Sequence, residues 1–226
     1  MKKPNRTWVV IPAYNEEKTL GEVITNLKKN SLKNIIVIND GSEDRTEEVA
    51  VKMGAKVYSH LINRGLGGAL NTGISAALLN GAEIIATCDA DGQHNPEDVK
   101  RAIDFLDKDN LDVVIGSRLL NPEGMPFLRR IGNKGFNFIT FLLFGIYSTD
   151  TQSGLRVFSK KAAEKLKIKT SKMEVSSEII KEIGRNKLNF KEISIKAIYT
   201  DYSMEKGQKN TNAFNILYKL FLRRAM

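Results

Sequence analysis

Two aspartates separated by one residue, in the segment Cys88–Gln93, are the residues of this chain whose type and spacing most clearly suggest chemistry. They follow the apolar run Ala82–Thr87, which is typical of a buried strand that ends where polar residues and glycine begin. Because side chains alternate along a strand, Asp89 and Asp91 are expected to project to the same side. Two such carboxylates repel each other unless a cation lies between them, and Mg²⁺ or Mn²⁺ is commonly bound by one or two carboxylates together with substrate phosphates. A solvated acidic turn is the alternative interpretation of an isolated pair.

Composition limits the classes of protein to consider. With 226 residues, 42% of them hydrophobic, the chain can bury a sizeable core in one domain. A single cysteine excludes a disulfide framework. His60 and His94 are too few and too scattered for a zinc site and are expected on the surface or in loops. The formal charge of +9 indicates an acidic partner, which can be nucleic acid, an anionic membrane or a phosphorylated ligand.

The sequence shows neither a signal peptide nor a spanning segment. Residues 1–6 contain no apolar stretch, and the longest apolar segment, Phe136–Tyr147, is interrupted by polar residues and glycine and is too short to cross a bilayer. We therefore expect a cytoplasmic protein without a spanning helix.

Strand and helix patterns alternate through the first half of the chain. Strands are predicted at Trp8–Ile11, Ile35–Asn39, Lys56–Ser59, Ile84–Cys88 and Asp112–Gly116, and helices at about Glu17–Lys29, Glu43–Met53, Gly67–Asn80 and Pro96–Lys108. This alternation predicts an α/β fold, a mainly parallel sheet flanked by helices. Ligands of such sheets bind beyond the carboxyl ends of the strands. That rule gathers four loops into one site: Pro12–Glu16, Asp40–Ser42, Asn63–Gly68 and Asp89–Gln93.

The alternation stops after about residue 120. A basic, aromatic-rich segment (Met125–Tyr147), a turn containing glycine (Asp150–Arg156), two helical stretches and a strand at Phe190–Ile198 follow. In the basic tail, Phe214, Leu217 and Phe221 recur at helical spacing, which predicts an amphipathic helix. We expect the chain to dock on a membrane surface through this helix and through Phe136–Tyr147. A terminal helix packed on the domain is the alternative.

Two common nucleotide-binding motifs are missing. The loop after the first strand contains no glycine, unlike the G-x-G-x-x-G of dinucleotide folds, and the segment Arg64–Ala69 lacks the G-K-[ST] ending of a P-loop. Arg64 and the amides of this segment could face a diphosphate, or the segment is simply the turn that enters a helix.

Five segments occur in an order that resembles a known family: Pro12–Glu16, Asn39–Thr46, Asn63–Gly67, Asp89–Gln93 and Gly116–Arg118. Together they resemble the family 2 glycosyltransferases of the GT-A fold, over roughly residues 7–200. Within that family, Leu128–Asn137 and Asp150–Arg156 are most similar to the polyprenyl-phosphate sugar synthases, such as the dolichyl-phosphate mannose and glucose synthases.

The resemblance implies roles for the matched residues. The nucleotide would be bound by Pro12, Tyr14, Asn15, Glu16, Asp40, Gly41, Ser42, Arg64, Gly67, Asp89, Ala90 and Asp91. A Mg²⁺ or Mn²⁺ ion would be held by Asp89, Asp91 and Gln93, and the acceptor phosphate by Arg118, Arg129 and Asn133. Asp89, Asp91 and Arg118 would be the catalytic residues. Residues 1–200 would form one catalytic domain, with a nucleotide-sugar half (1–118) and an acceptor half (119–200), and residues 201–226 a membrane-surface tail.

The implied activity is inverting, metal-dependent transfer of a hexose from a UDP- or GDP-sugar to a polyprenyl phosphate at the inner face of the membrane. A phosphate acceptor with a second pKa of about 6 is already anionic at pH 7. The alternative acceptor, a glycan or small-molecule hydroxyl, needs a base. Asp150 is the one candidate for that base, unless it caps a turn.

A nucleic-acid-binding protein is the rival of a different class. It would explain the charge of +9 but predicts basic residues interleaved with exposed aromatics and no metal site, so nucleic acid is not the expected partner. The sugar, the nucleobase and the association state, a homo-oligomer or a complex with a small membrane partner, stay open.

Overall fold

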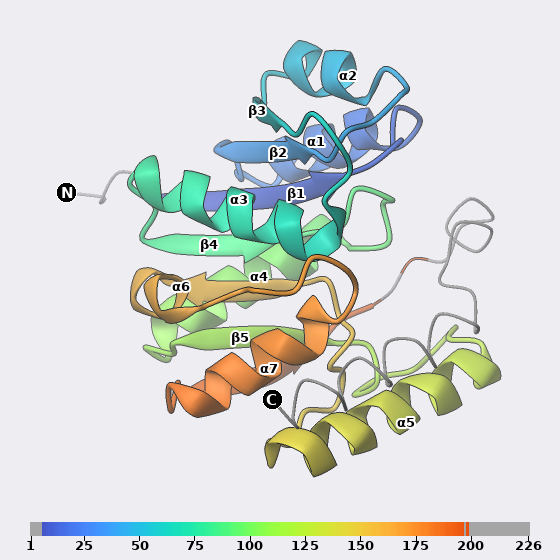
Figure 1. Cartoon of the computed structure of the whole chain (residues 1–226), viewed down its shortest axis with the longest axis vertical. Helices are drawn as coiled ribbons and strands as arrows, with labels where there is room; N and C mark the ends of the chain where they lie inside the picture. Colours follow the sequence, from blue (N-terminus) through green and yellow to red (C-terminus); the bar gives the residue numbers. More distant parts are fainter. Residues whose placement is uncertain (1–5, 197, 199–226) are drawn as a thin grey trace.

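The computed structural model describes residues 6–196 and 198, and its centre is a sheet of seven strands (Figure 1). The strands are β1 (Thr7–Ala13), β2 (Ile35–Asn39), β3 (Lys56–Ser59), β4 (Ile84–Thr87), β5 (Val113–Ser117), β6 (Arg156–Ser159) and β7 (Phe190–Ser194). Their order is β3-β2-β1-β4-β6-β5-β7. Only β6 runs antiparallel to its neighbours, β4 and β5. The expected mainly parallel α/β sheet is confirmed, and the sheet runs continuously through both halves of the chain.

Helices cover both faces of the sheet. They are α1 (Leu20–Lys29), α2 (Thr46–Lys52), α3 (Gly65–Leu79), α4 (Pro96–Lys108), α5 (Phe127–Phe144), α6 (Lys160–Lys165) and α7 (Val175–Arg185). The apolar sides of α1, α2 and α4 share one hydrophobic core with one face of the sheet, and those of α3, α6 and α7 share a second core with the other face. Figure 1 shows α5 at the end of the sheet, beside α7.

Local sequence explains the elements that match their predicted bounds. Every residue of β2, Ile-Ile-Val-Ile-Asn, is buried, as expected for a parallel strand covered on both faces. Helix α4 begins as predicted, because the Asn95 side chain accepts a hydrogen bond from the amide of Glu97 and Pro96 occupies the first helical position.

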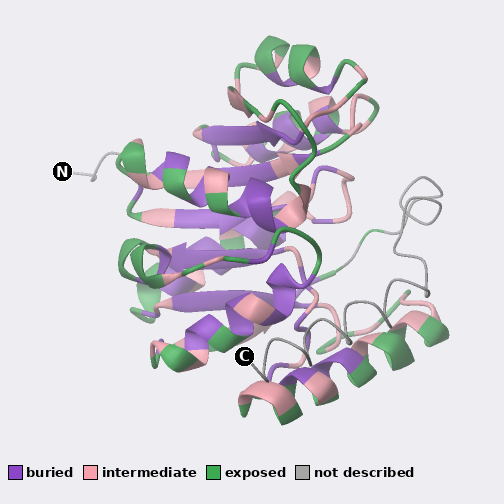
Figure 2. Ribbon diagram, viewed as in Figure 1, coloured by how far each residue is buried: buried purple, intermediate pink, exposed green. Residues whose placement is uncertain are grey.

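Helix α5 has two contrasting sides (Figure 2). Phe136, Asn137 and Thr140 are buried, whereas Leu128 and Phe138 are 74% and 62% exposed. Thus Phe136 points inward, although it begins the apolar segment predicted to face a membrane. None of the helices in residues 6–196 has the length and apolar character needed to span a bilayer.

Several predicted bounds are shifted by one to three residues, and three differences affect the interpretation of the site and the tail. β4 ends at Thr87, so Asp89 and Asp91 lie in the following turn and the strand-alternation reasoning does not apply to them. The segment predicted as a turn up to Arg156 leads directly into β6, a four-residue strand too short to show a pattern. β7 ends at Ser194, and the predicted tail helix lies outside the described residues.

Candidate active site

The predicted site residues gather at the edge where the parallel strands end. β1 and β4 are neighbours, and the chain leaves β1 toward β2 on one side and arrives at β4 on the other, which is the point where α/β sheets usually bind ligands. Because β6 is antiparallel, its first residue lies at this same edge, where Arg156 pairs with Thr87. The antiparallel strand therefore places the positively charged side chain of Arg156 at the carboxyl end of β4.

Asp89 and Asp91 lie in the turn after β4, close enough for their carboxylates to repel each other. Burial raises the pKa of Asp91, and the charge of Asp89 raises it further, against hydrogen bonds from Gln93. Gln93 donates its backbone amide to Asp91 Oδ1 at 3.0 Å and its side-chain Nε2 to Asp91 Oδ2. The three residues predicted to hold a metal are therefore brought together.

The Asp89 carboxylate is surrounded by cationic groups. Burial alone would raise the pKa of Asp89, but the hydrogen bond and charge of His94 and the charges of Arg118 and Arg156 outweigh burial and lower it. His94 Nε2 lies 3.0 Å from Asp89 Oδ2, and the His94 side chain is only 3% exposed. His94 lies in a loop, one of the two predicted positions, but its side chain is not on the surface, because the carbonyl of Gln93 pairs with the amide of Ile198 and the histidine turns inward.

Arg156 belongs to a matched motif, but no role was predicted for it. Its side chain is fully buried, and burial lowers its pKa to about 10 despite the attraction of Asp89 and Asp150. A buried arginine is normally held by carboxylates or carbonyls. Here one guanidinium nitrogen donates to the carbonyl of Thr151 at 3.0 Å. The burial of Arg156 leaves no local pattern in the sequence that could have indicated it.

Gly154 touches Asp89 where a side chain cannot fit. A Cβ built on Gly154 would lie 2.2 and 2.3 Å from the two carboxylate oxygens of Asp89. The carbonyl of Gly154 is fixed by the hydroxyl of Thr87, the last residue of β4, at 2.7 Å. The missing side chain at Gly154 therefore leaves the space in which the Asp89 carboxylate lies.

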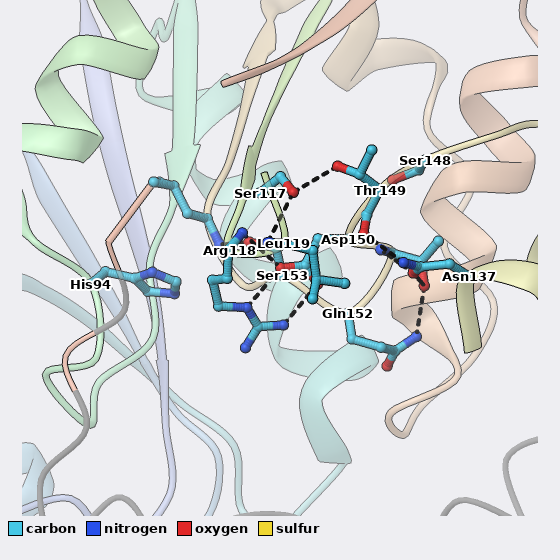
Figure 3. A network of polar contacts seen from close by, with 12 residues as sticks. His94, Ser117, Arg118, Leu119, Asn137, Ser148, Thr149, Asp150, Gln152 and Ser153 are labelled. Atoms are coloured by element: carbon cyan, nitrogen blue, oxygen red, sulfur yellow. Dashed lines mark hydrogen bonds and ion pairs between the residues drawn. The ribbon is translucent and has the colours of Figure 1, made fainter. Parts of the chain in front are cut away.

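Arg118 and Asp150 form a two-pronged ion pair (Figure 3). The Nε and Nη2 atoms of Arg118 donate to the two carboxylate oxygens of Asp150 at 2.7 and 2.8 Å, and its backbone amide donates at 3.0 Å. The Asp150 side chain is fully buried and that of Arg118 is 17% exposed. Since both oxygens of Asp150 are engaged in this way, the structure supports the structural interpretation of Asp150 and not its use as a base.

Asn137 ties α5 to the loop that carries Asp150. Its carbonyl oxygen accepts from the amide and the hydroxyl of Thr151, each at 2.9 Å, and its amide donates to the carbonyl of Thr149. Arg129 and Asn133 precede Asn137 by eight and four residues and so lie on the same helix face, half-buried. The predicted acceptor residues therefore belong to the side of α5 that turns toward the Asp150 loop.

Hydrogen bonds bind the first two nucleotide loops to each other. The amide of Asn15 donates to Ser42 Oγ at 3.0 Å, the amide of Glu43 donates to Asn15 Oδ1 at 2.9 Å, and the amide of Glu16 donates to Thr46 Oγ1 at 2.7 Å. Pro12, Glu16 and Gly41 are half-buried and Tyr14 is 43% exposed, so these residues remain partly accessible to a ligand.

The amides at the start of α3 are used within the protein, which corrects one expectation. Asp40 accepts the amides of Arg64 at 2.9 Å and Gly65 at 2.7 Å, and His60 Nδ1 lies 2.6 Å from its Oδ1. The amide of Gly67 donates to the carbonyl of Ser171 at 2.9 Å, and its Cα leaves no space for a side chain beside Thr170. The expected contact of these amides with a diphosphate is therefore not available here, whereas the Arg64 side chain is exposed.

Asp89, Asp91 and Gln93 fit a cation that is bound partly by the protein and partly by the substrate. In the part of the chain that the structure describes, no group of three or more His, Cys, Asp and Glu side chains is arranged to hold a metal. Two carboxylates and the amide oxygen of Gln93 leave further coordination positions to phosphate and water, as Mg²⁺ and Mn²⁺ prefer. These residues fit that role better than that of an all-protein metal centre.

Comparison with known proteins decides the family. The model of glycosyl transferase family 2 matches residues 8–167. The chain belongs to glycosyl transferase family 2.

Two relatives of this family 2 enzyme span most of its length. A UDP-N-acetylglucosamine–dolichyl-phosphate N-acetylglucosaminyltransferase of Methanococcus voltae is 40% identical over 95% of this chain and 94% of its own. A dolichyl-phosphate hexose transferase of Haloferax volcanii is 31% identical over 83% and 80%. Among solved structures, glucosyl-3-phosphoglycerate synthase of Mycobacterium tuberculosis, in complex with Mn²⁺, UDP-glucose and phosphoglyceric acid, shares the fold with a TM-score of 0.74 and 19% identity, over 96% of this chain and 79% of that one. The expected GT-A fold and family are thus confirmed.

Proposed function

We propose that this enzyme transfers a hexosyl unit from a nucleotide sugar to a polyprenyl phosphate, in a single inverting displacement that depends on a divalent cation, at the cytoplasmic face of a membrane. The observation that carries the proposal is the arrangement of Asp89 and Asp91 beside Arg118 and Arg156, at an edge where the candidate base Asp150 is buried in an ion pair. The relatives named for dolichyl-phosphate acceptors support the choice of acceptor.

The donor half supplies the nucleotide site. The loops around Pro12, Asn15 and Ser42 are braced against each other and lie beyond the ends of β1 and β2, next to the aspartate pair. When bound, a divalent cation supplies electrostatic stabilisation to the departing diphosphate. Asp89, Asp91 and Gln93 are the residues that would hold it.

A phosphate acceptor explains why the site needs no base. Asp150 has both oxygens on Arg118, and taking a proton would break a buried ion pair at a cost of roughly 3–5 kcal/mol. An anionic phosphate oxygen attacks without losing a proton, whereas a hydroxyl would need one removed. This geometry favours the phosphate acceptor over the glycan hydroxyl.

The proposed reaction forms one bond and breaks one bond at the anomeric carbon of the sugar. An oxygen of the acceptor phosphate forms a bond to the anomeric carbon while the bond from that carbon to the diphosphate oxygen breaks, and the electron pair leaves with the nucleoside diphosphate. Asp150 engages Nε and Nη2 of Arg118 and so fixes the orientation of the guanidinium, whose positive charge would attract the non-esterified oxygens of the acceptor phosphate. One displacement inverts the anomeric configuration.

The outer side of α5 is proposed to rest on the bilayer surface. Leu128, Phe138 and Leu142 are 74%, 62% and 55% exposed, and Arg130 and Lys134 are exposed on the same helix. Apolar side chains with flanking cations are typical of interfacial helices. In vesicle co-sedimentation of the full chain, Phe138→Asp should weaken binding to anionic vesicles, whereas Val51→Asp, at an exposed apolar position on α2, should not; equal binding of both variants would contradict the assignment.

The acceptor is tested by supplying alternatives to one donor. With a labelled nucleotide sugar and Mn²⁺, polyprenyl phosphate should yield a labelled lipid, whereas polyprenol and soluble sugars should yield none. Transfer to the soluble hydroxyl acceptors with no requirement for lipid phosphate would replace the proposal with its alternative.

A further inference from the structure

Glu192 is a half-buried carboxylate that has no role in the mechanism above. It lies on β7, the last strand in the sheet order, opposite Ile115 of β5. Because side chains alternate along a strand, Glu192 shares its side of the sheet with Phe190, which packs against the second core. A carboxylate on such a side is costly unless it is hydrogen-bonded, so its partners indicate what it does.

The Glu192 carboxylate binds the two residues that precede Asp150. Its Oε1 accepts the hydroxyl of Ser148 at 2.7 Å and the amide of Thr149 at 2.8 Å, and its Oε2 accepts the hydroxyl of Thr149 at 2.7 Å. Hydrogen bonds to an ionised acceptor are stronger than those between neutral groups. Glu192 therefore fixes the backbone and side chain of Thr149 directly before Asp150.

The same contacts continue to Arg118. The Thr149 hydroxyl gives its hydrogen to Glu192, so its oxygen can accept the hydroxyl of Ser117, which lies 2.6 Å away (Figure 3). Ser117 precedes Arg118 in the chain, and Thr149 precedes Asp150. A displacement of Thr149 would therefore disturb both partners of the Arg118–Asp150 ion pair.

We propose that Glu192 is a positioning residue for the acceptor side of the site. It holds Ser148 and Thr149 so that Asp150 keeps the Arg118 guanidinium in the orientation that attracts the acceptor phosphate. Glu192 acts through these residues and is not expected to contact substrate. The inference rests on the proposed function, which gives Arg118 its role. A carboxylate that only stabilised β7 would change the melting temperature and leave acceptor binding intact.

The first test uses Glu192→Gln, which keeps the size but replaces one accepting oxygen with an NH₂ group. The KM for polyprenyl phosphate should rise about tenfold, whereas the donor affinity measured by calorimetry stays within about twofold of wild type. Glu164→Gln makes the same change at an exposed position of α6 and should leave both values unaltered. An unchanged acceptor KM in Glu192→Gln, or an equal loss of donor affinity, would overturn the proposal.

Thr149 provides a second pair of variants. Thr149→Val removes the hydroxyl that links Glu192 to Ser117 and should raise the acceptor KM in the same way, whereas Thr149→Ser keeps the hydroxyl and should stay close to wild type. Equal values of the acceptor KM in these two variants would contradict the proposed link. This pair keeps the proposal testable if Glu192→Gln does not fold.

Combining Glu192→Gln with Arg118→Lys tests whether the effect passes through Arg118. Changes that act on one shared interaction are not additive, so the double variant should raise the acceptor KM no further than Arg118→Lys alone. Two tenfold rises that multiply to about a hundred-fold would show that Glu192 acts independently of Arg118 and would overturn the proposal.

A readout that needs no turnover separates this inference from the proposed function. The ¹⁵N–¹H NMR signal of Arg118 Nε, identified by its absence in Arg118→Lys, should shift in Glu192→Gln and Thr149→Val and stay in place in Glu164→Gln. An unchanged signal in Glu192→Gln would refute the role of Glu192 whatever the acceptor. If the wild-type enzyme transfers the sugar to a hydroxyl and not to polyprenyl phosphate, the proposed function fails, and the NMR signal still decides whether Glu192 positions Arg118.

Discussion

Replacing Gly154 with alanine should slow transfer by about a hundred-fold without unfolding the protein. The new Cβ would lie 2.2 and 2.3 Å from the carboxylate oxygens of Asp89, where an ordinary contact begins at 3.4 Å, so the carboxylate must retreat by about 1 Å. Gly154 is not among the residues with positive φ, so its backbone accepts alanine and the clash with Asp89 is the whole perturbation. A misplacement of about 1 Å costs on the order of a hundred-fold in rate, or about 2.7 kcal/mol in the activation barrier.

The assay is kcat/KM with a saturating lipid acceptor, measured together with the melting temperature and its rise with Mn²⁺. Gly135→Ala is the matched control, because its Cβ meets nothing within 4 Å on the exposed part of α5. We expect Gly154→Ala to lose activity and the response to Mn²⁺ while its melting temperature stays close to that of the control. Activity within about three-fold of wild type would refute the idea that Gly154 sets the position of Asp89.

Three further predictions follow from the same groups. Asp91→Asn should lower turnover several-hundred-fold, since a carboxylate that balances the cation is removed, and a variant that keeps more than about a tenth of wild-type turnover would exclude the metal role. Arg118→Lys keeps the charge but cannot form the two-pronged pair with Asp150 that orients it, so it should raise the KM for polyprenyl phosphate at least tenfold with donor affinity unchanged by calorimetry; a matching loss of donor affinity would move Arg118 to the donor site. The rise in melting temperature with Mn²⁺ should shrink as pH falls from about 7 to about 4. Because the pKa of Asp91 is raised in the folded protein, its negative charge destabilises the metal-free fold above that pKa, and protonation in acid relieves this effect. The cation, in contrast, needs the charged carboxylate. A rise in melting temperature with Mn²⁺ that does not depend on pH would contradict this prediction.

Local patterns in the sequence were enough to predict the strands and helices of the first half. β2 and β3 have the predicted bounds, and α4 begins and ends where its cap and its charges indicate. The meeting of the carboxyl-end loops also follows from alternation, since parallel strands place those ends at one edge. The family resemblance was likewise available from motifs that are contiguous in the chain.

What the sequence could not show depends on long-range pairing. The place of Arg156 comes from the antiparallel register of β6 on β4, and residues 69 apart must pair before its charge reaches Asp89. Likewise, Asp40 holds the amides of Arg64 and Gly65 because α3 begins beside β2, so a residue predicted to bind the nucleotide also has a structural role. His94 turns inward because its loop is paired with the segment at Ile198. None of these contacts leaves a local pattern.

The anomeric configuration of the lipid product tests the central claim most directly. Incubating the full chain and Mn²⁺ with an α-linked nucleotide sugar and a polyprenyl phosphate carrying ¹⁸O in its non-bridging oxygens allows the product to be examined by NMR and mass spectrometry. A single displacement by the acceptor phosphate predicts a β-linked glycosyl phosphate that retains the acceptor's ¹⁸O in the bridge to the sugar. An α-linked product, or no labelled lipid while the sugar appears on a hydroxyl acceptor, would contradict the account.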